Sequence, residues 1–167
     1  KDWKIPKAAE ILIYDANGSD ILFNYIDKDK SQVLHIRGES INIPSILLSK
    51  FTIQSYIDRY IKITKPKFIV TFTDNNISFY LLKSKHPEII FISIQNGLRG
   101  ARNDIFGLIE NVNVEMKVDY MLTFNEIIGA EYSKYISGKN ISIGSFKNNF
   151  YPKIKAKKNK SILFVSQ

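Results

Sequence analysis

Residues 88–100 read Glu-Ile-Ile-Phe-Ile-Ser-Ile-Gln-Asn-Gly-Leu-Arg-Gly, an apolar run that stops in a polar turn with glycine. Ile89 to Ile94 is almost entirely β-branched or aromatic, which predicts a strand buried on both faces of a parallel sheet. We therefore expect Ile92 to be fully buried. Gln95, Asn96 and Gly97 leave this strand at its carboxyl end, where open α/β sheets bind ligands. A simple turn explains Asn96-Gly97 equally well.

The order of strand, polar turn and helix repeats along the chain. Strands are expected at 10–14, 32–36, 67–73, 89–94, 119–124, 140–143 and 161–165. Helices are expected near 21–26, from Pro44 onward, and at 53–61, 77–85 and 125–136. This alternation predicts an α/β fold: a doubly wound, mostly parallel, Rossmann-like sheet of about six strands with helices on both faces.

Several local features follow from the same patterns. Asn17 or Ser19 is expected to cap the first helix, and Gly138 to end the helix that begins at Asn125. Residues 98–118 lack a clean period, which predicts a surface excursion with a short helix or none. Two sets of apolar residues are expected to form buried helix faces: Ile46, Leu47 and Phe51 in one helix, and Ile127, Ile128, Tyr132, Tyr135 and Ile136 in the other.

The net charge of +8 is concentrated in one lysine-rich stretch. Lys147, Lys153, Lys155, Lys157, Lys158 and Lys160 follow one another with no acidic residue among them. This stretch is typical of a solvated connector; contact with an anionic membrane remains open, and a nucleic-acid arm is disfavoured. The chain has no cysteine, which agrees with a reducing cytoplasm, and no apolar run reaches the roughly 20 residues that span a bilayer.

Polar side chains follow the strands and should gather at one edge of the sheet. They are Asp15, Asn17, Arg37, Glu39, Asp74, Asn75, Asn76, Gln95, Asn96, Glu126, Ser145 and Asn148. Carboxylates, amides and hydroxyls hydrogen-bond sugars well, and each carboxylate in the set could act as a general base toward a hydroxyl. Capping of a turn or a helix explains each of these acids as well. His35 and His86 lie in unrelated elements, so no metal site is expected.

Four short motifs occur in order: Asp74-Asn75-Asn76, Ser93 to Arg99, Thr123 to Gly129 and Ile143 to Asn149. Together they resemble the amino-terminal half of bacterial surface carbohydrate biosynthesis proteins that are similar to glycosyltransferases of the two-Rossmann-domain (GT-B) type. The resemblance covers residues 8–167. It implies transfer of a sugar from a nucleotide-sugar donor to a glycan or lipid-linked glycan acceptor, in lipopolysaccharide or capsule synthesis, in the cytoplasm or at the inner face of the membrane.

The resemblance also implies how the chain is divided. Residues 1–150 would form the acceptor-side domain, 151–160 a lysine-rich linker and 161–167 the start of a second domain that binds most of the nucleotide-sugar donor. Residues 1–167 alone would then transfer no sugar. Asp74 and Asp15 are the expected catalytic carboxylates, and the expected substrate-binding residues are Asn17, Glu39, Asn75, Asn76, Gln95, Asn96, Arg99, Glu126, Ser145 and Asn148.

Asp74 ranks first as the base, because two amides flank it and a helix follows it. Asp74→Asn would then reduce turnover and leave the fold intact, whereas a capping role predicts little change. A non-catalytic ligand-binding or receiver-like module is the alternative function. Receiver domains place an acidic pair after the first strand, however, and here Asp15 stands without an acidic neighbour.

Overall fold

The computed structural model describes residues 1–50, 52–99, 104–110 and 112–149. Within these ranges six parallel strands form one sheet in the order β2-β1-β3-β4-β5-β6. The strands are β1 (Ile11–Tyr14), β2 (Ser31–Leu34), β3 (Phe68–Thr71), β4 (Ile90–Ile94), β5 (Met116–Thr123) and β6 (Ile136–Ser142). The predicted parallel α/β fold is confirmed. The strand expected at 161–165 and the linker at 151–160 lie outside the described residues.

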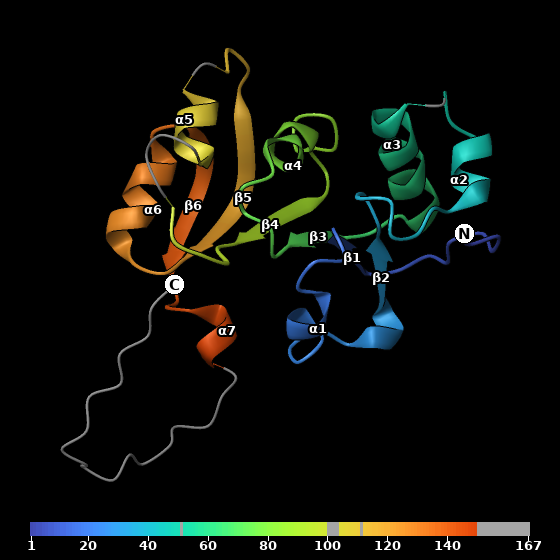
Figure 1. The fold of residues 1–167 in the computed structure, drawn as a ribbon, viewed down its shortest axis with the longest axis horizontal. Coiled ribbons are helices and arrows are strands. Elements are labelled where there is room, and N and C mark those ends of the chain that lie inside the picture. The colour runs from blue at the N-terminus through green and yellow to red at the C-terminus, as the bar shows by residue number, and fades with distance from the viewer. Residues whose placement is uncertain (51, 100–103, 111, 150–167) are drawn as a thin grey trace, which may run out of the picture.

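Helices connect consecutive strands. They are α1 (Ser19–Leu22), the 3₁₀ turn η1 (Lys28–Lys30), α2 (Ile43–Leu47), α3 (Ile53–Thr64), α4 (Ile77–Leu82), α5 (Ile105–Ile109), α6 (Glu126–Ser133) and α7 (Phe146–Asn149). Figure 1 shows the sheet running from β6 on the left to β2 on the right. Each crossover returns the chain to the same edge, so the carboxyl ends of all six strands line one edge of the sheet.

The chain changes direction across the sheet at β1. It passes from β1 to β2 on one side, and then returns to place β3 on the other side of β1. The register is regular across this point, because Ile13 lies opposite Val33 in β2 and Val70 in β3. Ligands of open α/β sheets bind beside the strand ends at such a reversal, which directs attention to the segments after β1 and β3.

One face of the sheet carries the larger core. Leu12, Ile69 and Phe91 project from three neighbouring strands and are fully buried. Helices α3 to α6 cover them with large side chains, among them Tyr60 of α3 and Phe79 of α4. The apolar positions of α3 recur at helical spacing, so one side of the helix packs on the sheet and the other faces solvent.

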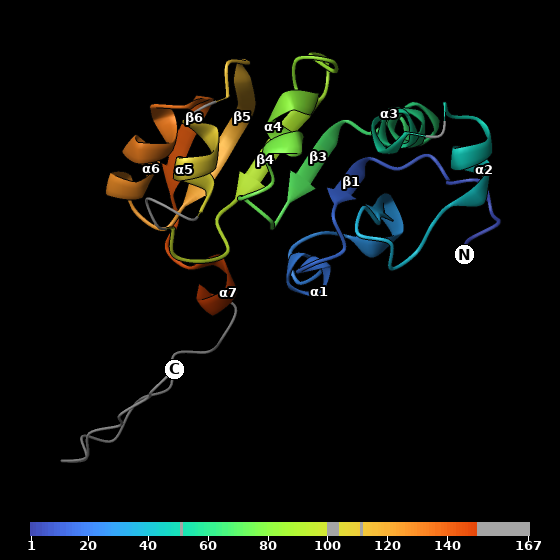
Figure 2. The same cartoon turned by 45° about the horizontal axis from the view of Figure 1, so that its top comes forward.

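The opposite face is covered unevenly. Leu22 of α1 and Phe146 of α7 pack with Ile13, Val70 and Ile94. In Figure 2, α1 and α7 lie below the sheet and α3 and α4 above it. Ile90 and Tyr120, on β4 and β5, remain more than a third exposed on this less covered face. The expectation that Ile92 is fully buried is therefore wrong: Ile92 is opposite Tyr120 and only partly buried.

Local sequence signals explain the ends of α2 and α3. Asn42 caps α2 by accepting the Ser45 N–H at 3.0 Å, and proline occupies its first turn. At α3, Thr52 and Ser55 form a capping box. Lys65 ends α3 in the left-handed region with φ 48°, just before Pro66. The helix predicted at 53–61 is confirmed, and it extends to Thr64.

Other details of the predicted helices were wrong. Gly18, with φ 76°, is the residue before α1, and no side chain caps that helix, so neither Asn17 nor Ser19 does so. A Cβ on Gly18 would lie 2.3 Å from Cδ1 of Phe72, so the turn needs glycine for close approach as well as for its φ. Leu47 and Ile127 are exposed rather than buried. Phe51 lies outside the described residues.

The segment after α6 also differs from its prediction. The helix ends at Ser133 with Lys134 as its C-cap, so Gly138 does not cap it. Ile136 and Gly138 belong to β6, which pairs with β5 across a register shift between Lys117 and Tyr120. A Cβ on Gly138 would lie 2.2 Å from the Val118 carbonyl oxygen, so the close approach of the two strands explains this glycine.

The segment 98–118 contains the short helix α5, as expected. It is more than a surface excursion, because Ile105, Phe106 and Ile109 are buried in the larger core. Asp104 caps the helix by accepting the Ile105 N–H at 2.7 Å. Strand β5 begins at Met116, three residues earlier than the expected Asp119.

The unequal cover of the two faces can be tested with neighbouring residues of β4. Phe91→Ala should lower the free energy of unfolding by about 3–5 kcal/mol, because Phe91 is fully buried in the larger core. Ile92→Ala should cost about 2 kcal/mol or less, at or below the lower limit for a buried isoleucine. Chemical denaturation of both variants gives the comparison. A larger loss for Ile92→Ala would contradict the assignment of the two faces.

Tyr60 provides a pH-dependent test of the packing of α3. Burial raises its pKa to about 12 from the ordinary 10.0, and its hydroxyl donates to the Val33 carbonyl at 3.3 Å. The folded state therefore holds this proton more tightly than the unfolded state. The resulting stabilisation is complete below about pH 10 and is lost as pH rises toward 12. The stability difference between the parent protein and Tyr60→Phe should shift in favour of the variant over that window; a constant difference would contradict it.

Candidate functional site

The candidate site lies at the carboxyl ends of β3, β4 and β5. Its centre is Asp74, which follows β3 by three residues and is fully buried. Arg99 reaches it from the turn after β4, and Tyr132 reaches it from α6. The structure thus brings together Asp74, Asn96 and Arg99, three residues that the sequence places at this edge.

Protein donors fill both oxygens of the Asp74 carboxylate. Oδ2 accepts from Arg99 Nε at 2.7 Å and from the Tyr132 hydroxyl. Oδ1 accepts from Arg99 Nη2 and from the Asn96 N–H at 3.1 Å. A carboxylate offers about four acceptor positions, so these four donors leave none for a ligand. The geometry favours a positioning role for Asp74 over that of a general base.

Arg99 is held in place as firmly as its partner. Its side chain is only 8% exposed, and Nη2 also donates to Asn96 Oδ1 at 2.5 Å. Nη1 lies 3.6 Å from Oδ2 of Asp104, the cap of α5. Burial opposes the charge of the guanidinium, but hydrogen bonding to Asp74 and its negative charge outweigh burial and raise the pKa of Arg99. The ion pair joins the segments after β3 and β4 to α5.

Two buried tyrosines complete this cluster. The Tyr80 hydroxyl donates to the Asp74 carbonyl oxygen at 2.5 Å and lies 3.0 Å from Ser93 Oγ. Burial, followed by the negative charge of Asp74, raises the pKa of both Tyr80 and Tyr132. Both therefore remain neutral donors at ordinary pH. They tie α4 and α6 to the end of β3.

Gln95 fixes the neighbouring turn. Its side chain is buried, with Nε2 donating to the Gly97 carbonyl at 2.9 Å and Oε1 accepting the Phe124 N–H at 2.8 Å. The amide thus links the turn after β4 to the end of β5. Both ends of Gln95 have partners within the chain, so its contribution to a ligand site would be to position Asn96 and Phe124.

A second buried Asp–Arg pair lies after β1 and β2. Asp15, fully buried and with φ 80°, accepts on Oδ2 from Arg37 Nε at 2.8 Å and lies 2.7 Å from Nη2. Its Oδ1 accepts the Asn17 N–H at 3.1 Å. Like Asp74, Asp15 forms an ion pair with an arginine that follows the next strand along the chain. The two pairs lie on either side of the β1–β3 boundary, where the strand order reverses.

The other predicted site residues divide into two groups. Asn76 caps α4 by accepting the Ser78 N–H at 3.1 Å, and Ser145 lies at the start of α7. Asn17, Glu39, Asn75, Glu126 and Asn148 are exposed near the strand ends. Among the described residues, nothing forms a hydrogen bond or ion pair with the carboxylates of Glu39 and Glu126. These two are the predicted bases that stay open to a ligand.

Two hollows adjoin Arg99 and share Ile127 and Ile128. One, of about 400 Å³, is also lined by Phe106, Glu110, Glu131 and Tyr135. The other, of about 200 Å³, is also lined by Gln95, Leu98, Phe124 and Asn125. Aromatic and aliphatic walls with carboxylates and an amide at their margins suit a hydroxylated ligand, whose ring faces are apolar and whose hydroxyls are not.

Sequence reasoning missed part of this site. Tyr132 was assigned only to an apolar helix face, and its hydroxyl instead donates to Asp74. Glu110 and Glu131 gave no sequence signal, because charged residues on short helices are ordinarily solvated. Over the described ranges, no group of three or more His, Cys, Asp or Glu residues could hold a metal ion. In the same ranges, no helix is long and apolar enough to cross a membrane.

Comparison with known proteins bears on the second half of the chain. Residues 90–167 match the model of a family described as "putative O-antigen biosynthesis protein". The match supports a part in surface carbohydrate biosynthesis. No curated protein and no solved structure gave a significant match. The matched segment contains β4 to β6, Arg99, Glu126 and both hollows, whereas Asp15 and Asp74 precede it.

The positioning role of Asp74 can be tested by its amide variant. Asp74→Asn leaves Arg99 buried without its counterion, which should lower the free energy of unfolding by about 3–5 kcal/mol. Asp104→Asn is the matched control: it removes the other partner of Arg99 but keeps the helix cap, and should cost about 1 kcal/mol or less. Thermal or chemical denaturation measures both. Parent-like stability of Asp74→Asn would restore the general-base hypothesis.

Proposed function

We propose that this chain is the acceptor-side domain of a GT-B-type glycosyltransferase that extends a surface polysaccharide such as O-antigen. The observation that carries the proposal is the overlap of the family match with the hollows beside Arg99. That segment combines an open carboxylate, an amide and apolar walls at the carboxyl edge of a parallel sheet, the edge at which α/β folds bind ligands.

Glu126 is the base that this proposal favours. It is exposed in the first turn of α6, and its sequence neighbours Asn125 and Ile127 line the smaller hollow. A carboxylate whose oxygens have no partner can accept the proton of an acceptor hydroxyl. Asp15 and Asp74 have the same chemistry, but arginine and backbone donors occupy their oxygens.

The reaction that follows is a substitution at the anomeric carbon of the donor sugar. The acceptor hydroxyl oxygen forms the new glycosidic bond, the bond between that carbon and the donor phosphate breaks, and the nucleotide leaves. The hydroxyl proton passes to Glu126. The nucleotide-sugar would bind mainly a second domain after residue 167, so residues 1–167 alone are expected to transfer no sugar.

The role of Glu126 can be measured in the full-length protein. Glu126→Gln should reduce turnover of a nucleotide-sugar and an O-antigen oligosaccharide by about 10²- to 10⁴-fold, the usual contribution of a general base. Its melting temperature should match the parent's, because Glu126 is exposed and carries no ion pair to a described residue.

Glu115→Gln is the matched control. Glu115 is exposed and pairs with Lys117 at 2.9 Å at the amino end of β5, the edge opposite the site. This variant should keep full turnover. Full turnover by Glu126→Gln would remove Glu126 as the base, and absence of any sugar transfer by the full-length parent with a panel of nucleotide-sugars would contradict the transferase itself.

A further inference from the structure

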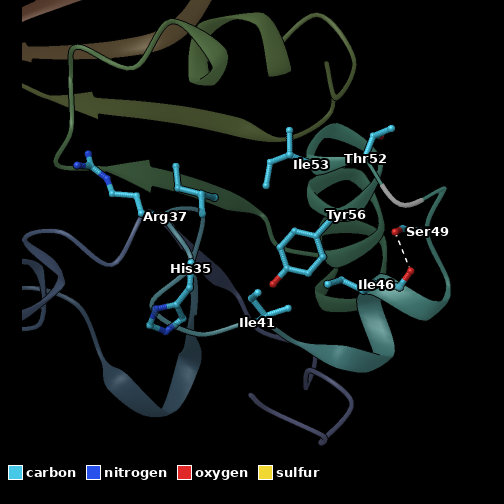
Figure 3. A pocket seen from close by; sticks show the side chains of 10 residues that line it. His35, Arg37, Ile41, Ile46, Ser49, Thr52, Ile53 and Tyr56 are labelled. Carbon is cyan, nitrogen blue, oxygen red and sulfur yellow. Dashed lines mark hydrogen bonds between the residues drawn. The ribbon is translucent and has the colours of Figure 1, made fainter.

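A separate pocket of about 470 Å³ lies beyond the end of β2, between the segment after that strand and helices α2 and α3. Figure 3 shows Arg37 and His35 at the margin of the pocket on one side, with the Arg37 guanidinium pointing away from Tyr56, and Tyr56 and Ile53 of α3 on the other side. None of its lining residues lines the hollows beside Arg99. It is therefore a second site on the same sheet.

The wall of this pocket is mainly apolar. Ile41, Ile46 and Ile53 line it, and the ring of Tyr56 projects between them. The Tyr56 hydroxyl accepts the Asn42 N–H at 3.4 Å, which holds the ring in place. Ile41 and Ile53 are exposed in spite of their size, so an apolar ligand would remove their surface from water.

The margin of the pocket next to β2 carries nitrogen atoms of Arg37 and His35. Arg37 uses Nε and Nη2 to hold Asp15, while half of its side chain stays exposed and Nη1 has no bond to a described residue. His35 Nδ1 is buried and lacks a partner in the described part of the chain. A Cβ on Gly38 would meet nothing within 4 Å, so the backbone beside Arg37 leaves open space. An anionic group could approach the guanidinium from that space.

We propose that this pocket binds an amphipathic anion. An apolar chain or ring would occupy the space among Ile41, Ile46, Ile53 and Tyr56, and a phosphate or carboxylate would pair with Arg37. Asp15 orients the guanidinium in advance, so little side-chain entropy is lost when the anion binds. The proposal does not depend on the transferase reaction, because it concerns other residues and a binding step alone.

Titration calorimetry of residues 1–167 with octyl phosphate tests the proposal. Octyl phosphate should bind at least about tenfold more tightly than inorganic phosphate, which lacks the apolar part, and than octanol, which lacks the charge. Equal affinity for octyl phosphate and either partial ligand, or no binding of octyl phosphate at all, would overturn it.

Substitution at the pocket mouth locates the bound ligand. Ile53→Glu places a negative charge in the apolar wall and should weaken octyl phosphate binding by at least about tenfold. Leu47→Glu is the matched control, because Leu47 is as exposed as Ile53 but does not line the pocket. Equal effects of the two variants would show binding elsewhere. Arg37 itself is not substituted, because its loss would leave the buried Asp15 carboxylate without a counterion.

Two sources could supply such an anion, a free metabolite or a lipid headgroup with its chain. Vesicles of phosphatidylglycerol separate them. If the parent protein sediments with these vesicles, and Ile53→Glu does not while Leu47→Glu still does, the ligand of the pocket is a membrane lipid. Octyl phosphate binding without vesicle binding assigns it to a free molecule. Vesicle binding that both variants retain, combined with no binding of octyl phosphate, would contradict the pocket.

Discussion

The ion pair between Asp74 and Arg99 is the interaction on which the arrangement of the carboxyl edge depends. Neither partner is solvated, so each charge is tolerable only because the other is there. Through Tyr80, Tyr132 and Asp104 the same pair sets the positions of α4, α6 and α5. The two hollows beside Arg99 take their shape from these helices. The exposed residues of the site therefore rest on a buried cluster in which Arg99 lines the hollows and Asp74, Tyr80 and Tyr132 do not.

Much of the fold could be predicted from the sequence, because the sequence signals for its strands and helices are local. The apolar runs that predict strands and the helical spacing of apolar residues at 53–61 depend only on near neighbours, and the structure confirms the six described strands and this helix. Gly138 shows the limit of such reasoning. The same residue can end a helix or let two strands approach, and only its contact with Val118, distant along the chain, decides between them. The prediction that Ile92 is fully buried was wrong for a similar reason, because the sequence does not show how completely helices cover each face of the sheet.

The candidate site was harder to predict for a related reason. Asp74, Asp15 and Glu126 have similar surroundings in sequence, because each lies where a strand passes into the helix that follows it. They differ in which distant cation reaches them: Arg99 for Asp74, Arg37 for Asp15 and none among the described residues for Glu126. Contact with a distant arginine therefore decides whether a carboxylate has a structural role or stays available to a ligand. Sequence patterns placed all three at one edge and ranked Asp74 first, without the contacts from Arg99 that occupy its oxygens.

The position of β1 between β2 and β3 also governs how the chain can fold. The Glu10 carbonyl accepts the N–H groups of both Lys67 and Phe68, at 2.9 and 3.1 Å, which closes a loop of 57 residues. Closing such a loop costs conformational entropy before the compensating contacts between the strands have formed. Parallel sheets of this kind therefore fold slowly. During synthesis, β1 has only β2 as a partner until β3 emerges. For that interval the apolar edge of β1 is open to pairing with other chains, and rapid arrival of β3 protects the nascent protein from aggregation.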